Sequence, residues 1–181
     1  MIAIEESEDM KKALIVVDMQ KGFLNEHTEK LVRTINHFLE TKMDKFDYVW
    51  FSKFHNPDNS SFKKHINWKK MTREEEQEIV LEEGLLAKGK VFEKHVYTAY
   101  TDEILKELEK NGVEELYLCG IGSDSRVLKT ALDFFERGIK VKVIRNLTAS
   151  FDGERMYICG LSVIKKCIGK ENVIWHQDLD F

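Results

Sequence analysis

The sequence ELYLCGIGSDSRVLKTALDFFERG, residues 115–138, places a strand, a glycine turn and a helix in one continuous piece. The apolar run 116–119 predicts a buried strand, and Gly120 and Gly122 allow the sharp turn after it. Apolar residues then recur with helical spacing, and Gly138 suits the position that follows a helix. These apolar residues are Val127, Leu128, Ala131, Leu132 and Phe135. The stretch therefore predicts one complete βα unit.

The glycine turn directs the N-terminus of this helix out of the sheet. Free backbone N–H groups and the positive end of the helix dipole meet there, which suits an anion or a developing oxyanion. The first helical turn, however, carries Arg126, a fixed positive charge where the dipole favours a negative one. This residue decides what chemistry the turn can support.

Length and charge limit the class of protein. A chain of 181 residues suits a single domain, residues 1–181, that buries roughly 70% of its extended-chain surface. The net charge of -4 argues against a nucleic-acid or membrane partner. The opening MIAIEESED is acidic where a signal peptide needs a basic region, and no apolar run approaches the ~18 residues of a membrane span. We therefore expect a cytoplasmic protein.

The three cysteines lack the spacing of metal ligands, and we expect reduced thiols. Cys119 falls inside the strand of the opening stretch, where a small apolar residue is ordinarily buried. Cys159 and Cys167 lie eight positions apart on a predicted helix, residues 152–169, and their spacing places them on roughly one face. We expect both to be core residues.

Short apolar runs alternate with helical patterns along the rest of the chain. The predicted strands are 13–17, 47–52, 90–93, 116–119, 140–145 and 172–175. This alternation predicts an α/β fold, a three-layer α/β/α sandwich with a Rossmann-like parallel sheet. Residues 54–89 are less regular and predict a lid with one short helix, capped by Thr72 with Glu75 as its capping-box partner.

Charged groups leave the carboxyl ends of several predicted strands. Asp18 follows the first strand, Lys94 the third, and the turn with Arg126 the fourth. Lone charges at strand ends are most often simply solvated. Ligands of open parallel sheets nevertheless bind beyond this edge, so the joint placement favours a site.

Four segments resemble a known family, the isochorismatase-like cysteine hydrolases, which include nicotinamidases and N-carbamoylsarcosine amidohydrolases. The segments are ALIVVDMQKGF, FHNPDNSSFKKHINW, KHVYTAY and GIGSDSRVLKTALDFFERG. The resemblance covers nearly the whole chain and implies a six-stranded parallel sheet, a homo-oligomer and a Cys-Asp-Lys triad. Asp18 takes the place of the catalytic aspartate, and Lys94 that of the catalytic lysine.

The resemblance also implies a mechanism. A thiolate attacks an amide or imine-type carbon, and backbone N–H groups of the glycine turn stabilise the oxyanion. A non-proline cis peptide is implied between Ile121 and Gly122. The cysteine position of the motif is occupied by Arg126, and a protonated guanidinium cannot attack carbon.

Three replacements for the missing nucleophile are conceivable, each with an argument against it. Ser125 precedes the motif position, but a helix turns about 100° per residue and would aim its hydroxyl elsewhere. Cys119 lies seven positions earlier, inside the predicted strand. A metal-activated water would need ligands such as His55, Asp58 and His65, but Lys53 stands where metal-binding members have an aspartate. We therefore expect neither a metal nor a cofactor.

Two functions from different classes remain. The first is hydrolysis of a small amide or related substrate, impaired by the loss of the cysteine. The second is a non-catalytic role, in which the protein binds a small anionic ligand or a partner subunit. Arg126 would then either pair with Asp18 or hold a carboxylate or phosphate beside Lys94.

The candidate ligand-binding residues belong to the loops around this edge. They are Phe23, His55, Trp68, Tyr97, Ile121 and Gly122. Aromatic side chains in such loops can stack on a planar substrate, or they can pack beneath a lid or in a subunit interface. The apolar segment 54–89 would suit such an interface.

Overall fold

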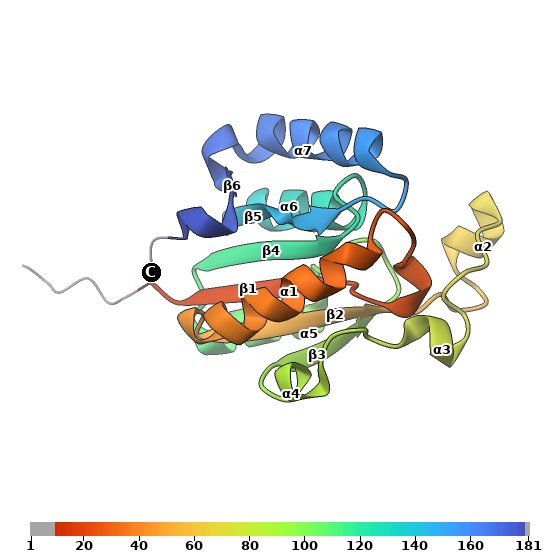
Figure 1. The fold of residues 1–181 in the computed structure, drawn as a ribbon, viewed down its shortest axis with the longest axis horizontal. Coiled ribbons are helices and arrows are strands. Elements are labelled where there is room, and N and C mark those ends of the chain that lie inside the picture. The colour runs from red at the N-terminus through yellow and green to blue at the C-terminus, as the bar shows by residue number, and fades with distance from the viewer. Residues whose placement is uncertain (1–9, 180–181) are drawn as a thin grey trace, which may run out of the picture.

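The computed structural model describes residues 10–179, so MIAIEESED and the expectation that rests on it lie outside the described residues. Six parallel strands form one sheet in the order β3-β2-β1-β4-β5-β6 (Figure 1). Their bounds are β1 Lys12–Val17, β2 Tyr48–Phe54, β3 Lys90–Lys94, β4 Glu115–Ile121, β5 Lys140–Ala149 and β6 Val173–Ile174. The chain winds outward from β1 to β3 and then returns to pair β4 with β1. The order therefore switches direction between β1 and β4.

Helices cover both faces of this sheet and give the three layers (Figure 1). The long helices are α1 Glu29–Lys42, α5 Asp102–Asn111, α6 Arg126–Phe135 and α7 Glu154–Ile168. Short 3-10 turns are η1 Lys21–Phe23, η2 Met43–Lys45, η3 Lys170–Asn172 and η4 His176–Asp178. The predicted α/β/α sandwich is confirmed. None of the helices among residues 10–179 combines the length and apolar character needed to cross a bilayer.

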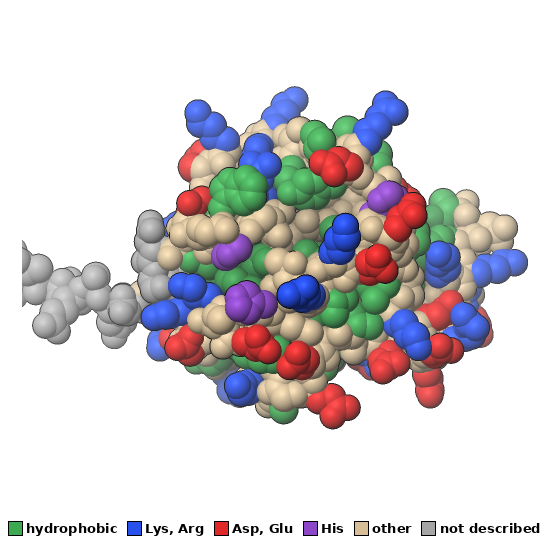
Figure 2. Space-filling view, in the orientation of Figure 1, with side chains coloured by type: hydrophobic (Ala, Val, Ile, Leu, Met, Phe, Trp, Pro, Cys, Tyr) green, Lys and Arg blue, Asp and Glu red, His purple; other side chains and the backbone are tan. Residues whose placement is uncertain are grey.

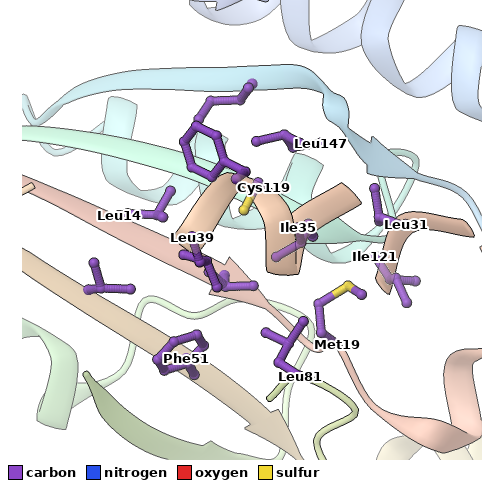
Figure 3. Packing of buried hydrophobic residues seen from close by; sticks show 14 of the residues in the cluster. Leu14, Met19, Leu31, Ile35, Leu39, Phe51, Leu81, Cys119, Ile121 and Leu147 are labelled. Atoms are coloured by element: carbon purple, nitrogen blue, oxygen red, sulfur yellow. The ribbon is translucent and has the colours of Figure 1, made fainter. Parts of the chain in front are cut away.

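The core is divided by the sheet into two apolar clusters because successive strand residues point to opposite faces. On β1, Leu14 and Val16 join the cluster under α1, whereas Ile15 and Val17 join the cluster under α5, α6 and α7. Figure 3 shows the first cluster, in which Cys119 lies among leucine and isoleucine side chains. Both faces of the central strands are thus buried, as their continuous apolar sequences predict.

The segment between β2 and β3 differs from the single helix that we predicted. It holds three short helices, α2 Ser61–Ile66, α3 Glu74–Gln77 and α4 Glu83–Leu86, and α2 projects beyond the sheet (Figure 1). The predicted cap was wrong by one residue. Arg73 is the N-cap of α3, and the Glu76 carboxylate accepts from its backbone N–H at 3.2 Å. Glu75 instead pairs with Lys21.

Two other predictions of burial were wrong. Cys159 and Cys167 are exposed on α7, because that helix buries the opposite side, with Leu161, Ile164 and Ile168. On α6 the ring of Phe135 is exposed and Phe134 is buried in its place.

Candidate active site

The carboxyl ends of three strands converge on one buried cluster. Asp18 directly follows β1, Lys94 ends β3, and Arg126 begins α6 after the turn that leaves β4. A Cβ atom on Gly120 would collide with the backbone oxygen of Val17, so glycine is needed for β4 to lie against β1 here. This close approach brings the turn to Asp18.

The Asp18 carboxylate is held from several sides. It is fully buried, and its backbone adopts a positive φ of 47°, which is uncommon for a residue other than glycine. Ser52 on β2 donates its hydroxyl to Asp18 Oδ1 at 2.6 Å and accepts from the Asp18 backbone N–H at 3.2 Å. Lys94 Nζ lies 2.7 Å from Asp18 Oδ2. The carboxylate is therefore fixed in orientation by one neutral and one charged partner.

Lys94 is equally well partnered. Besides the ion pair with Asp18, its ammonium donates to the carbonyl oxygens of Val96 at 3.0 Å and Tyr97 at 2.9 Å. The ammonium has three N–H donors and three acceptors around it. Lys94 thus ties the end of β3 to Asp18 across the intervening strand β2.

Arg126 has a different environment. Only 8% of its surface is exposed, and Nε lies 3.4 Å from Asp18 Oδ2 without a hydrogen-bond partner among the described residues. The guanidinium carbon lies 4.0 Å from the centroid of the Phe23 ring. The rings of Phe54, Trp68 and Tyr97 lie between 5.6 and 5.8 Å from it. Stacking and cation–π contacts therefore replace most of the hydrogen bonds that a buried guanidinium ordinarily makes.

The cluster holds two cations and one carboxylate. Burial lowers the pKa of Lys94, and the Arg126 charge lowers it further, while Asp18 acts in the opposite direction. Burial also lowers the pKa of the Arg126 guanidinium, against the effect of Asp18. Both shifts have the sign expected for a cation removed from water.

Arg126 lines a pocket of about 330 Å³ that opens at this edge of the sheet. Phe23, Trp68 and Tyr97 also line it, and the Phe23 and Trp68 rings are stacked with their centroids 6.3 Å apart. Charged residues complete the lining: Lys70, Asp124 and Asp152. Three predicted ligand-binding residues and Arg126 therefore share one pocket.

The other predicted ligand-binding residues lie outside this lining. His55 follows β2, and its ring lies 5.3 Å from that of His95. Ile121 is fully buried in the cluster under α1 (Figure 3). Gly122 lies behind Arg126 in the turn, where an added Cβ would crowd the Arg126 backbone nitrogen at 3.0 Å.

The turn also departs from the expected oxyanion site. The described residues contain no cis peptide, so the expected cis bond between Ile121 and Gly122 is wrong. The N–H groups of Gly122 and Ser123 donate to the carbonyl of Ala149 at 2.8 and 3.1 Å. Two of the turn's amides are thus engaged with β5 and are not free for a ligand. Gly160 of α7 packs on the Ser123 backbone, where a side chain would collide.

The structure places the three replacement nucleophiles unequally. Cys119 is buried in the core, where burial raises the pKa of its thiol, so it is an inert thiol. Ser125 lines the pocket beside Arg126. Asp58 pairs with Lys63 at 2.7 Å, and residues 10–179 contain no group of three or more His, Cys, Asp and Glu placed to hold a metal ion.

Sequence reasoning missed two polar residues that build the site. Ser52 stood in the predicted second strand as its last residue, and its hydroxyl orients Asp18. Gln20 is buried, donates to the carbonyls of Phe54 and Gln77, and accepts from the Phe54 N–H. Ser52 could have been noticed as a polar residue at the end of an apolar strand. The sequence around Gln20, QKGF, contains no feature that indicates its hydrogen bonds to other loops.

Comparison with known proteins gives a family and a fold. The Isochorismatase domain model matches residues 12–170. Isochorismatase family protein 2A of Dictyostelium discoideum is 39% identical over 62 residues, which cover 33% of this chain and only 31% of that relative. The chain therefore matches about a third of that protein's length.

Solved structures match over most of the chain. Nicotinamidase from Bacillus subtilis superposes with a TM-score of 0.77 at 23% identity, over 92% of this chain and 100% of that one. N-carbamoylsarcosine amidase from Thermoplasma acidophilum gives a TM-score of 0.72 at 22% identity, over 86% and 93%. At these identities the two likenesses show the fold alone.

Proposed function

The chain belongs to the isochorismatase family, and from this premise we propose that it binds a small planar anion in the pocket beside Arg126 and does not hydrolyse amides through a thiol. The observation that carries the proposal is the identity and placement of Arg126. By the resemblance of its motif it takes the place of the family's cysteine, and it lies 3.4 Å from Asp18, the ion-pair partner of Lys94. A hydrolase of this type needs a nucleophile where the chain has a cation.

The charge balance of the cluster supports an anionic ligand. Within the cluster Asp18 compensates one of the two cations, with Lys94 as the closer partner at 2.7 Å, while Asp124 and Asp152 act on Arg126 from the lining of the pocket. A buried charge without full compensation is costly, so a bound carboxylate or phosphate would relieve that cost. The guanidinium is suited to this because its planar donors match the geometry of such groups.

The shape of the pocket supports a planar ligand. Its walls include the rings of Phe23, Trp68 and Tyr97, and a pocket of about 330 Å³ is at the lower end of the range for small-molecule sites. Aromatic walls favour a flat ring by stacking. An aromatic carboxylate the size of nicotinate meets both requirements.

Residual hydrolysis is the second candidate function, and one observation favours it. Asp18 and Lys94 retain a close ion pair at 2.7 Å, which is the acid and lysine part of the expected triad. Ser125 lines the same pocket. Hydrolysis of a small amide by this residue would require a change in its position relative to Asp18.

Composition supports a small-molecule partner over a nucleic acid. The net charge is -4, and basic and acidic side chains are interspersed on the face shown in Figure 2. Such a surface does not favour a nucleic-acid partner.

Nicotinate and nicotinamide form a matched pair of probes, because they share one ring and differ in the charge of one group. We expect nicotinate to raise the melting temperature of the wild-type protein more than nicotinamide does, and Arg126→Met to lose this effect. Lys70→Met is the control, because it removes an exposed cation from the lining. Equal stabilisation by the two probes, or an unchanged response in Arg126→Met, would overturn the proposal.

A further inference from the structure

Two carboxylates lie in the lining of the pocket that holds Arg126. They belong to Asp124, in the turn after β4, and to Asp152, in the loop after β5. The two strands pair in parallel with Ile121 opposite Ala149, and each aspartate lies three residues beyond its member of this pair. The pairing of β4 with β5 therefore places two negative charges in one part of the lining.

Hydrogen bonds hold the two segments that carry these carboxylates. Two amides of the turn after β4 donate to the carbonyl oxygen of Ala149. In the loop that follows, the side-chain amide of Asn25 donates to the carbonyl oxygen of Phe151 at 2.8 Å. The backbone N–H of Asp152 donates to Ser150 Oγ at 3.1 Å. The turn and the loop are therefore fixed relative to each other.

Neither aspartate makes an ion pair with a cation of residues 10–179. The ion pair of Arg126 is with Asp18. Lys70, the other cation of the lining, has its Nζ 4.7 Å from the centroid of the Phe151 ring and pairs with neither aspartate. Like charges placed close together disfavour each other unless a cation compensates them. The two carboxylates therefore offer a place to a cationic group from outside the chain.

The buried part of the same lining has the opposite charge. Arg126 is only 8% exposed, and its Nε has no hydrogen-bond partner among the described residues. Asp124 is partly buried and Asp152 is exposed. Burial therefore increases from the two carboxylates toward the guanidinium. This order predicts that the anionic group of a ligand lies deep in the pocket and that a cationic group lies at its rim.

We propose that the ligand of this pocket is a small aromatic zwitterion, whose carboxylate binds Arg126 and whose protonated amine binds Asp124 and Asp152. The inference rests on the proposed function, because it takes the carboxylate from that proposal and adds a cationic group to the same molecule. Arg126 and Lys70 balance the two aspartates of the lining, so a ligand without net charge matches it. A volume of about 330 Å³ suits one ring with two small substituents.

Three related probes test this by isothermal titration of the full chain. Para-aminomethylbenzoate carries the ring and both charges, para-toluate lacks the amine, and para-methylbenzylamine lacks the carboxylate. We expect the wild type to bind para-aminomethylbenzoate at least about fivefold more tightly than para-toluate, the effect of two partly exposed charge pairs. Equal affinity for these two would overturn the inference. Binding of para-methylbenzylamine as tight as that of the zwitterion would also overturn it, because it would indicate a site for a cation alone.

Substitution of the two aspartates tests which residues carry the preference. We expect the double variant Asp124→Asn and Asp152→Asn to lose the preference for the zwitterion, and each single variant to lose part of it. Para-toluate should bind the double variant at least as tightly as the wild type, because fewer negative charges then oppose its carboxylate. Asp44→Asn is the matched control, since it removes an exposed carboxylate from η2, which precedes β2 at the amino end of the sheet.

A preference for the zwitterion that persists in the double variant, or that Asp44→Asn also removes, would overturn the inference. Para-toluate separates this outcome from a failure of the proposed function. If the wild type binds para-toluate and Arg126→Met does not, while the amine adds nothing, then Arg126 binds an anion and the cationic part of the site is wrong. If the wild type binds neither carboxylate, both proposals are wrong.

Discussion

The two halves of the buried cluster are built differently although they share one carboxylate. On the strand side, Ser52 and Lys94 hold Asp18, and every polar contact is between 2.6 and 3.2 Å. On the turn side, Arg126 lies 3.4 Å from the same carboxylate, with Nε unpartnered and aromatic rings around the guanidinium. On the strand side both carboxylate oxygens have a close contact, whereas on the turn side Arg126 Nε has no hydrogen-bond partner among the described residues.

This difference suggests separate roles for the two halves, with the strand side stabilising the fold and the turn side binding a ligand. The network of Asp18, Ser52 and Lys94 joins the ends of β1, β2 and β3. We expect it to stabilise the fold whether or not the protein is an enzyme. Arg126 Nε makes no hydrogen bond with that network, and the proposed role of Arg126 is to bind a ligand. The following predictions test this separation.

The largest effect is expected from the shared carboxylate. Asp18→Asn leaves Lys94 and Arg126 buried without a counterion, and loss of one partner from a buried pair costs about 3–5 kcal/mol in the free energy of unfolding. Denaturant titration measures this. Asp58→Asn is the control, because its ion pair with Lys63 involves a fully exposed carboxylate, and we expect a change below about 1 kcal/mol. Similar values for both would show that the cluster is not a stabilising network.

A direct contrast between the two halves comes from Lys94→Met and Arg126→Met. Lys94→Met removes the closest partner of Asp18 and leaves the carbonyls of Val96 and Tyr97 without a donor, so we expect a loss of roughly 3 kcal/mol. Arg126→Met replaces a poorly hydrogen-bonded cation with an apolar chain, and we expect the free energy of unfolding to change by less than about 1 kcal/mol. A larger loss for Arg126→Met than for Lys94→Met would reverse the assignment of roles.

Removal of the guanidinium should leave a site for a free one. Arg126→Ala opens a space beside the Phe23 ring and Asp18, and we expect methylguanidinium to stabilise this variant. At ten times the dissociation constant, the gain is about 1.4 kcal/mol. Calorimetric melting curves measure it, and Arg126→Met is the control because its side chain fills the space. Equal responses from the two variants would show that the aromatic surroundings do not bind the guanidinium.

The smallest expected effect is on the pH dependence of stability. The pKa of Lys94 is lowered in the folded state, chiefly by burial, from 10.5. The unfolded chain therefore binds this proton more tightly, and wild-type stability should rise relative to Lys94→Met as the pH increases toward 10.5. Above that value the folded and unfolded states are both neutral at this position. A difference that stays constant or shrinks over this interval would contradict the lowered pKa.

Much of the fold could be predicted because it depends on local patterns. Apolar runs and turns follow from periodicity, and strands that alternate with helices indicate a parallel sheet. The errors came from tertiary packing. Which side of α7 meets the core depends on the close contact of Gly160 with the turn at Ser123, so the exposure of Cys159 and Cys167 could not be derived from spacing alone.

The site could be predicted in part for the same reason. Asp18, Lys94 and Arg126 stand at strand ends or at a helix start, and parallel topology brings such positions together. The aromatic rings around Arg126 come from loops whose paths the sequence does not specify, such as those that carry Phe23 and Trp68. The use of the Gly122 and Ser123 amides by Ala149 is likewise a contact between β5 and the turn, 26 or more residues apart in the chain.

The most direct test of the central claim is a measurement of ammonia and nicotinate formed from nicotinamide by the wild-type protein, with nicotinamidase from Bacillus subtilis as the positive control. If Arg126 takes the place of the nucleophile, as we propose, the wild-type protein should form no product above a blank without protein. Product that disappears in Lys94→Met would contradict the account, since it would show that the retained Asp18 and Lys94 still serve a nucleophile in this pocket.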